Sequence, residues 1–325
     1  MVHGLIYVSD KDPGIARKRH RKSFRYIDDK GQIISCDTEL ARINALGVPP
    51  AYEEVWICAL PNGHIQATGL DVARRKQYRY HAEWTSSQDE AKFGALAEFG
   101  LRLPRIRRKV DAALSDKNLG ASFDKNLAAA AVVRLIDQTA IRIGGRSKKS
   151  QGATTLTVNN VNLTRNRMQL RFTAKGGRRF QSTLDDRKLQ RILGKIHDLP
   201  GKRLFQYIGQ DGLIHPLDSG DVNSWLKEIS GMDISAKMFR TWHGSAAALH
   251  AVLKAPKPSV KGACEAAAES LCNTPAIARK SYVHPDILDL IGDEVRLDAF
   301  RKLPLKRRAG LTASESRLLM LIAGA

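Results

Sequence analysis

Hydrophobic and polar positions alternate in short runs over the first part of the chain. Runs of this kind, bounded by Gly, Pro, Asn and Asp, are typical of strands. The pattern predicts strands at Phe24–Ile27, Gln32–Ile34, Val55–Leu60 and His64–Thr68. Asn62-Gly63 lies between the last two runs, and an Asn-Gly pair in that place is a strong hairpin signal. This part of the chain is therefore predicted to form a small antiparallel sheet.

Beyond about Ser86 the apolar residues recur at helical spacing. Gln88–Leu101 places its apolar residues roughly on one face of a helix. Pro104 is expected to open or kink the next helix, because proline lacks the amide hydrogen that a helix interior uses. Asn126–Ile143 is the most apolar stretch, rich in Ala and Val. We expect it to be a helix at the centre of the core.

A second short sheet is predicted within the helical part. Its strands are expected at Thr154–Val158, Met168–Thr173 and Arg178–Thr183, with turns at 164–167 and 174–177. The remainder is predicted to be helical and to end in Ala313–Ile322. Together these elements predict an α+β fold with two domains. Residues 1–85 would form a β-rich DNA-binding domain, and residues 86–325 a larger, mainly helical domain with a short three-stranded sheet.

Charge narrows the choice of partner. The chain has 325 residues, with 53 Lys and Arg against 33 Asp and Glu, a net charge of +20. Nucleic acid is the usual partner of so basic a chain, because each neutralised phosphate releases counterions. A ribosome-associated or membrane-surface protein would also be basic. Leu127–Val133 is too short to span a bilayer and Met1–Asp10 lacks the order of a signal peptide, so we expect a cytoplasmic, nucleoid-associated protein without a membrane partner.

The common catalytic signatures are absent from the sequence. There is no G-x-x-x-x-G-K-[ST], G-x-G-x-x-G, G-x-S-x-G or H-E-x-x-H motif, and no paired aspartate cluster. None of the four cysteines forms a C-x-x-C pair, so neither a zinc site nor a disulfide framework is expected, and we interpret them as reduced thiols. Chemistry on phosphates would then need no ATP, metal or other cofactor, and Arg, Lys and a side-chain nucleophile would carry it.

Three basic segments are candidates for contact with DNA. Residues 17–22 precede the first predicted strand, and residues 102–109 lie on a predicted helix; for both, a solvated charged face is an equally good interpretation. Residues 74–80 are more informative, because cations alternate there with Gln and Tyr. Cations can meet phosphates while amide and aromatic groups meet bases or sugars. The predicted DNA-binding residues are Arg75, Gln77, Tyr78 and Tyr80.

Four later segments each contain residues suited to phosphate chemistry. They are Ala140–Gly145 with Arg142, Ala174–Gly177 with Lys175, Lys237–Trp242 with Arg240, and Asn273–Tyr282 with both Asn273 and Tyr282. In chain order these residues are Arg, Lys, Arg, Asn and Tyr. That order, in these local contexts, resembles the active site of type IB DNA topoisomerases of the compact bacterial and poxvirus-like kind.

The resemblance extends upstream and covers about residues 25–285. Gly47–Tyr52 with Val55–Cys58, and Gln66–Gly69 with Arg75–His81, look like the family's N-terminal domain. The resemblance implies a monomer whose two domains form a C-shaped clamp around double-stranded DNA. It implies cleavage of one strand through a 3′-phosphotyrosyl link, rotation of the free 5′ end and resealing, with relaxation of supercoils.

The resemblance also implies a role for each site residue. Arg142 and Arg240 would clamp the phosphate oxygens, since guanidinium groups donate paired hydrogen bonds and stay charged. Tyr282 would be the nucleophile. Lys175, on an exposed turn, would be the general acid that protonates the departing 5′ oxygen, a gain of about 10²–10⁴-fold. Asn273 stands where poxvirus and eukaryotic members have His, and it would add one neutral hydrogen bond.

Two other readings share part of this evidence. Tyrosine site-specific recombinases have the same Arg, Lys, Arg, Tyr order, but usually with His-x-x-Arg where this chain has Lys237-x-x-Arg240. A non-catalytic protein that binds double-stranded DNA would explain the charge alone. It would not explain why Arg142, Lys175, Arg240 and Tyr282 are all retained. Residues 145–152 and Leu70 depart from the family's usual pattern, so DNA contacts there are left open.

Overall fold

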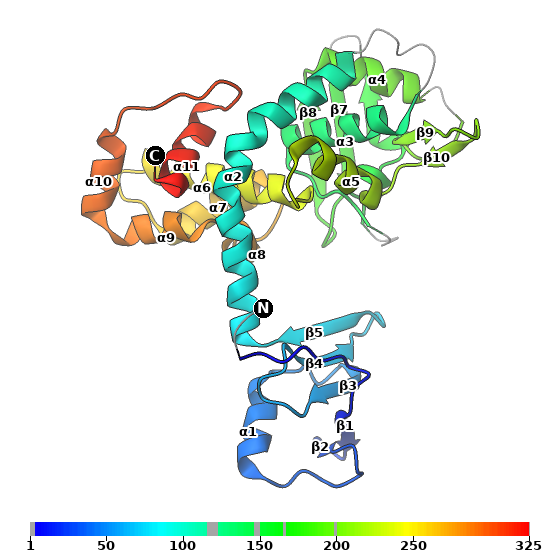
Figure 1. Ribbon diagram of the computed structural model, residues 1–325, viewed down its shortest axis with the longest axis vertical. Helices are drawn as coiled ribbons and strands as arrows, with labels where there is room; N and C mark the ends of the chain where they lie inside the picture. Colours follow the sequence, from blue (N-terminus) through cyan, green and yellow to red (C-terminus); the bar gives the residue numbers. More distant parts are fainter. Residues whose placement is uncertain (1–3, 116–122, 146–149, 165–166, 198–199, 325) are drawn as a thin grey trace. The chain divides into compact units, whose positions relative to one another are not determined.

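The computed structural model describes residues 4–115, 123–145, 150–164, 167–197 and 200–324. The chain divides into two compact units, Met1–Lys92 and Phe93–Ala325. Helix α2 (Ala82–Ser115) begins in the first unit and continues into the second (Figure 1). The predicted division between residues 85 and 86 falls within this helix. The α+β fold class is confirmed, with an antiparallel sheet in the first unit and a mainly helical second unit.

The first unit is a five-stranded antiparallel sheet with one short helix. Its strands are β1 (Gly14–His20), β2 (Ser23–Ile27), β3 (Glu53–Cys58), β4 (Ile65–Leu70) and β5 (Lys76–Tyr80), in the order β2-β1-β3-β4-β5. Helix α1 (Asp37–Ala45) packs Ile43 with Ile15 and Ile57 from the sheet. The predicted hairpin around Asn62-Gly63 is confirmed as β3 and β4, which pair antiparallel.

Two expectations for this sheet are wrong. Gln32–Ile34 is not a strand, because Ile33 makes only an isolated bridge to Ile27. The basic run at residues 17–22 does not precede the first strand: it forms the end of β1 and the turn into β2. Arg17 is accommodated there because its guanidinium donates hydrogen bonds to the carbonyl oxygens of Val48, Pro49 and Tyr52.

Helix α2 is continuous through Pro104, so the proline does not separate two helices as expected. A proline inside a helix costs about 3 kcal/mol, because a hydrogen bond is lost and the preceding turn is crowded. On either side of it, Phe99, Leu103 and Ile106 are completely or almost completely buried. Burying one such side chain contributes about 1.5–3 kcal/mol, so together they outweigh the proline.

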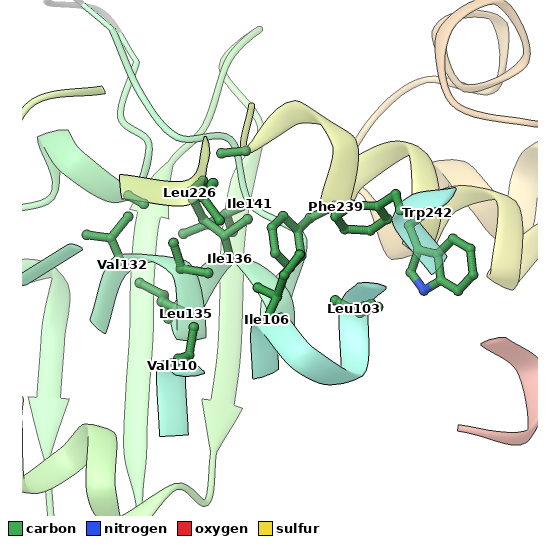
Figure 2. Close-up of a cluster of buried hydrophobic side chains, with 14 of the residues drawn as sticks. Leu103, Ile106, Val110, Val132, Leu135, Ile136, Ile141, Leu226, Phe239 and Trp242 are labelled. Carbon is green, nitrogen blue, oxygen red and sulfur yellow. The ribbon is translucent and has the colours of Figure 1, made fainter. Parts of the chain in front are cut away.

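Helix α3 (Lys125–Thr139) is the centre of the second unit's core. Figure 2 shows its Val132, Leu135 and Ile136 beside side chains from α2 and from α6 (Lys237–Lys254). The helix starts at Asp124, whose carboxylate accepts from the Leu127 amide at 2.8 Å. The expected helix to Ile143 is too long, because Ala140 adopts a left-handed conformation (φ 51°) that ends it.

The remaining elements of the second unit surround this core. They are η1 (Ala153–Thr155), η2 (Val158–Asn160), β6 (Val161–Leu163), β7 (Met168–Thr173), β8 (Arg179–Leu184), α4 (Arg187–His197), β9 (Gln206–Ile208), β10 (Ile214–Pro216), α5 (Ser219–Ser230), α7 (Val260–Ser270), α8 (Pro275–Ser281), α9 (Pro285–Gly292), α10 (Glu294–Lys302) and α11 (Ala313–Ala323).

The predicted three-stranded sheet is present as β6-β7-β8, with one strand misplaced. The expected strand at 154–158 is instead occupied by parts of the 3₁₀ turns η1 and η2 and by Thr157, which makes an isolated bridge to Arg203. The first strand comes later, at Val161–Leu163. Of the expected turn at 164–167, residues 165–166 lie outside the described residues. The β9–β10 pair was not predicted. Over the described part of the chain, no helix combines the length and apolar character needed to cross a membrane.

A buried ionic network joins distant parts of the second unit. Arg107 on α2 forms salt bridges with Asp137 on α3 (2.8 Å) and Glu315 on α11 (2.7 Å). Trp242 donates its indole N–H to Glu315, and His243 lies 3.0 Å from Asp137. The pKa values of both carboxyls lie below their usual range, because Arg107 outweighs the effect of burial. The network therefore fixes α11 against the helix that carries Arg240.

Candidate active site

Arg142 lies on an irregular segment just after α3, not on the helix as expected. The Arg142 carbonyl accepts from the Ala153 amide at 2.8 Å, which fixes this segment against the 3₁₀ turn η1. The two stretches approach closely, since a Cβ on Gly152 would lie 2.6 Å from the Arg142 carbonyl oxygen. Glycine at this position permits the contact. Of the neighbouring segment 145–152, residues 146–149 lie outside the described residues.

Arg240 lies on α6 and is 2% exposed. Its guanidinium donates to the carbonyl oxygens of Ala140 and Leu271, the latter at 3.1 Å. Ala140 is two residues before Arg142, and Leu271 is two residues before Asn273. Arg240 therefore holds together three of the predicted site segments. Its Nε is buried and has no hydrogen-bond partner in the structure.

Tyr282 lies at the C-terminal cap of α8 and is 7% exposed. Its carbonyl oxygen accepts from the Ser245 hydroxyl at 2.8 Å, and the same hydroxyl accepts from the His284 amide at 3.0 Å. A Cβ on Gly244 would lie 3.2 Å from the Tyr282 Cβ. Gly244 and Ser245 on α6 thus form a close-fitting support for the backbone of Tyr282.

The electrostatic surroundings of Tyr282 favour its ionised form. The Arg240 guanidinium carbon lies 4.9 Å from the centre of the tyrosine ring. Burial alone would raise the pKa of Tyr282, but the charge and hydrogen bonding of Arg240, with the charges of Arg142 and Lys237, bring it below the usual value. A phenol in this position is easier to convert to the nucleophilic phenolate.

Lys175 lies at the exposed tip of the β7–β8 hairpin, as expected. The Ala174 amide donates to the Arg178 carbonyl at 2.7 Å, and Gly176 and Gly177 both have positive φ, which closes the turn. Ala174 lines a small hollow together with Arg142 and Arg240. The hairpin therefore brings Lys175 to the neighbourhood of the two arginines.

Asn273 is buried between α7 and α8, at 6% exposure. Its side-chain oxygen accepts from the Thr274 backbone amide at 3.0 Å, and its backbone amide donates to the Ala268 carbonyl at 2.8 Å. Its Nδ2 has no partner. Among the described residues only four buried side-chain atoms lack a partner, and two of them, Arg240 Nε and Asn273 Nδ2, belong to this site.

The predicted DNA-binding residues lie on or beside β5 in the first unit. Arg75 pairs with Asp71 at 2.6 Å, and Gln77 donates to the same carboxylate at 3.1 Å. Tyr78 and Tyr80 stack with their ring centres 5.8 Å apart and are 44% and 46% exposed. The two rings are thus available to a partner, while Arg75 and Gln77 are engaged within the protein.

Sequence reasoning missed several residues that shape the site. Gly244 and Ser245 follow Arg240 by one helical turn, and that spacing was the only available signal. Lys237, at the start of α6, adds charge near Tyr282. Cys272 adopts a left-handed conformation (φ 47°) between Leu271, whose carbonyl accepts from Arg240, and Asn273. No local sequence pattern indicates this conformation.

A group with metal-binding chemistry also lies in the second unit. Donor atoms of Asp137, His243 and Glu315 lie within 4.8 Å of one another. Arg107 pairs with both carboxylates and so already supplies positive charge to this cluster. The arrangement is that of a structural ionic network.

Comparison with known proteins agrees with these features. The family model "Bacterial DNA topoisomerase IB, N-terminal domain" matches residues 23–71, and "Eukaryotic DNA topoisomerase I, catalytic core" matches residues 81–284. The chain is 30% identical over 298 residues to DNA topoisomerase 1B of Acanthamoeba polyphaga mimivirus, covering 85% of this chain and 87% of the relative. This chain belongs to the type IB DNA topoisomerase family. The predicted resemblance is confirmed, and the protein is a DNA topoisomerase, an isomerase.

Solved structures of the site-specific recombinase XerH bound to difH substrate are also similar to this topoisomerase. The post-cleavage complex gives a TM-score of 0.36 at 17% identity, covering 59% of this chain and 50% of that one. The pre-cleavage complex gives 0.38 at 18% identity, with 62% and 52% covered. This topoisomerase thus spans about half the length of those chains.

Proposed function

We propose that this topoisomerase relaxes supercoiled double-stranded DNA by cutting one strand with Tyr282, letting that strand rotate, and resealing it without ATP or a metal ion. The observation that carries the proposal is the pairing of Arg240 with Tyr282. One guanidinium contacts the phenol, holds two neighbouring segments by their carbonyls, and keeps a buried donor unpaired. A phosphate oxygen is the kind of acceptor that such a donor requires.

The chemistry balances without another reagent. The Tyr282 phenol releases its proton to water, and its oxygen bonds to phosphorus as the bond to the 5′ oxygen breaks. Lys175 gives that 5′ oxygen a proton and takes one back from water. The DNA is then held through its 3′ phosphate. Arg142 and Arg240 stabilise the negative charge that builds on the phosphate oxygens, and Asn273 adds a neutral hydrogen bond. Resealing reverses the steps, since the phosphotyrosyl link keeps the energy of the broken bond.

The two parts of the chain would divide the work. We assign residues 1–85 to DNA binding, with Tyr78 and Tyr80 meeting bases or sugars, and residues 86–325 to cleavage. Arg75 and Gln77 would contact DNA after giving up their hydrogen bonds to the Asp71 carboxylate. We further propose that the enzyme acts as a monomer and is associated with the cytoplasmic nucleoid.

The first test is relaxation of a negatively supercoiled plasmid with EDTA present and ATP absent. Wild type should relax it, and Tyr282→Phe should not. Tyr207→Phe, on β9 of the same unit, is the matched control and should retain activity. Failure of wild type at every salt concentration would overturn the proposal, and equal activity of wild type and Tyr282→Phe would place the nucleophile elsewhere.

A second test examines Lys175 by itself. Lys175→Ala should slow single-turnover cleavage by about 10²–10⁴-fold. Replacing the departing 5′ oxygen with sulfur should restore most of the rate, because a thiolate leaves without needing a proton. If the sulfur substrate is slowed as much as the oxygen substrate, Lys175 is not the general acid.

A further inference from the structure

The β1–β2 hairpin of the first unit carries four exposed cations that the proposed function does not use. Arg21 and Lys22 form the two-residue turn between the strands, because His20 pairs with Ser23 on either side of it. Lys18 on β1 and Arg25 on β2 are directly paired just behind the turn. All four side chains are exposed. They are called the β1–β2 cluster below.

The β1–β2 cluster differs in charge from the segment at β5. Each cation of residues 74–76 forms a salt bridge with a carboxylate of the same unit. Within the described part of the chain, no side chain of the β1–β2 cluster has an ion-pair or hydrogen-bond partner. The β5 side of the sheet thus offers the exposed rings of Tyr78 and Tyr80, with its cations neutralised, while the β1–β2 end offers cations without a counter-charge.

Lys18 and Arg25 lie on the same face of the sheet as Tyr78. Directly paired residues share a face, and one row of such pairs crosses all five strands. From β2 to β5 this row is Ile27, Ala16, Trp56, Thr68 and Tyr78. Lys18 follows Ala16 by two positions, so it points to the same side, and Arg25 is paired with it. At the usual strand spacing, Lys18 lies about 16 Å from Tyr78 across this face.

That separation suits a single duplex lying against the face. The major groove of B-DNA is about 12 Å wide, so rings that enter the groove have the phosphates of its rim roughly one groove width away. Lys18 and Arg25 have long side chains that can cover the remaining distance. Phosphate contacts position a duplex, while groups in the groove meet bases or sugars. The two ends of the sheet would then act on one DNA molecule.

The hairpin itself is less stable for carrying these residues. Two-residue turns favour Asn and Gly, because they require positive φ. Arg21 occupies such a position, with φ 52°, which is unfavourable for a residue with a side chain. Lys18 and Arg25 also place like charges directly opposite each other, which destabilises a pair of strands. A line of phosphates at the turn would remove this repulsion, so the cluster fits a polyanion better than it fits the isolated fold.

We propose that the β1–β2 cluster binds the phosphate backbone of the same duplex that Tyr78 and Tyr80 meet; this rests on the proposed function. The contact is electrostatic, so it holds the duplex against the sheet whatever its sequence. Each cation that neutralises a phosphate contributes about 0.9 to the slope of log affinity against log salt. At about 0.1 M salt, loss of one such contact weakens binding by about eightfold.

The test measures binding by the full chain carrying Tyr282→Phe, so that cleavage does not interfere. The probe is a fluorescently labelled duplex too short to hold two protein molecules, titrated by anisotropy over a range of salt concentrations. Arg21→Gly and Arg25→Gln should each reduce the slope by about 0.9, and should weaken binding to different sequences by a similar factor. Lys30→Gln removes an exposed cation from the turn that follows β2, and this matched control should keep the slope.

Thermal unfolding distinguishes a lost contact from a damaged hairpin. Arg21→Gly relieves the left-handed conformation, and Arg25→Gln removes the repulsion with Lys18, so neither should lower Tm. Equal slopes for Arg25→Gln and Lys30→Gln, or weaker binding that comes only with a lower Tm, would overturn the proposal. So would an unchanged slope combined with loss of the ability to bridge a biotinylated duplex to a labelled one, because the cluster would then bind a second duplex.

Binding and relaxation are measured independently, so the two proposals can fail separately. If the slope falls as expected but wild type never relaxes a plasmid, the proposed function is refuted and the phosphate contact stands. If wild type relaxes the plasmid and the slope is unchanged in both hairpin variants, only the phosphate contact is refuted.

Discussion

Ser245→Ala tests how the backbone of Tyr282, the proposed nucleophile, is supported. The Ser245 side chain is fully buried on α6, and its hydroxyl bridges the Tyr282 carbonyl and the His284 amide at 2.8 and 3.0 Å. Alanine removes both hydrogen bonds without adding bulk. We expect the variant to fold but to hold Tyr282 less well.

The size of the effect follows from the two backbone groups that lose their bond to Ser245. A buried polar group deprived of its partner costs about 1–3 kcal/mol, so the loss of two partners in Ser245→Ala should cost about 2–6 kcal/mol of stability. For a unit of this size, about 1 kcal/mol lowers Tm by about 2–4 °C, which gives a fall of about 4–24 °C. Misplacing the nucleophile should also slow cleavage by up to about a hundredfold.

Thr241→Val is the matched control for this experiment. Thr241 is on the same helix and equally buried, but its hydroxyl has no hydrogen-bond partner. Replacing an unsatisfied hydroxyl with a methyl group should leave Tm unchanged or raise it. Thermal unfolding by circular dichroism and single-turnover cleavage of a labelled duplex measure both quantities. If Ser245→Ala matches wild type in both, or Thr241→Val loses as much stability, the reasoning is wrong.

Two further substitutions have clear expected outcomes. Asp10 pairs with Lys76 beside the exposed tyrosines of β5, so Asp10→Asn should free Lys76 to bind a phosphate. Binding to duplex DNA, measured by fluorescence anisotropy, should tighten, and the slope of log affinity against log salt should steepen by about 0.9. An unchanged slope would show that Lys76 does not reach a phosphate. A Cβ on Gly100 would lie 2.3 Å from the Trp242 ring, so Gly100→Ala should lower Tm, whereas Gly94→Ala on the same helix, where the space is open, should raise stability by about 0.5–1 kcal/mol. Equal Tm values for the two glycine variants would contradict this.

Local patterns predicted those parts of the fold that local chemistry determines. The β3–β4 hairpin follows from its Asn-Gly turn, and the burial of α3 follows from its apolar composition. Strand β1 was missed because Arg17 interrupts the apolar alternation. Its guanidinium donates hydrogen bonds to carbonyl groups about thirty residues further along, a contact that no local window contains.

The sequence provided a list of candidate site residues, but it did not provide their arrangement. The resemblance picked out Arg142, Lys175, Arg240, Asn273 and Tyr282. The structure brings three of them together, because Arg142 and Arg240 line one hollow and the charges of both act on Tyr282. The supporting contacts depend on tertiary packing. Arg240 binds a carbonyl 100 residues away, and Ser245 binds one 37 residues away, so neither could be inferred from spacing.

The salt bridge between Arg107 and Glu315 spans 208 residues of chain. Closing a loop of that length costs conformational entropy and is slow. The salt bridge can form only after nearly all of the second unit has been synthesised. The helix that carries Arg240 is braced by this bridge through Trp242. We therefore expect a chain shortened after residue 312 to bind DNA without nicking it, which a plasmid nicking assay would check. A chain still being synthesised would then not cut DNA, because the proposed cleavage activity would form only when the second unit has folded.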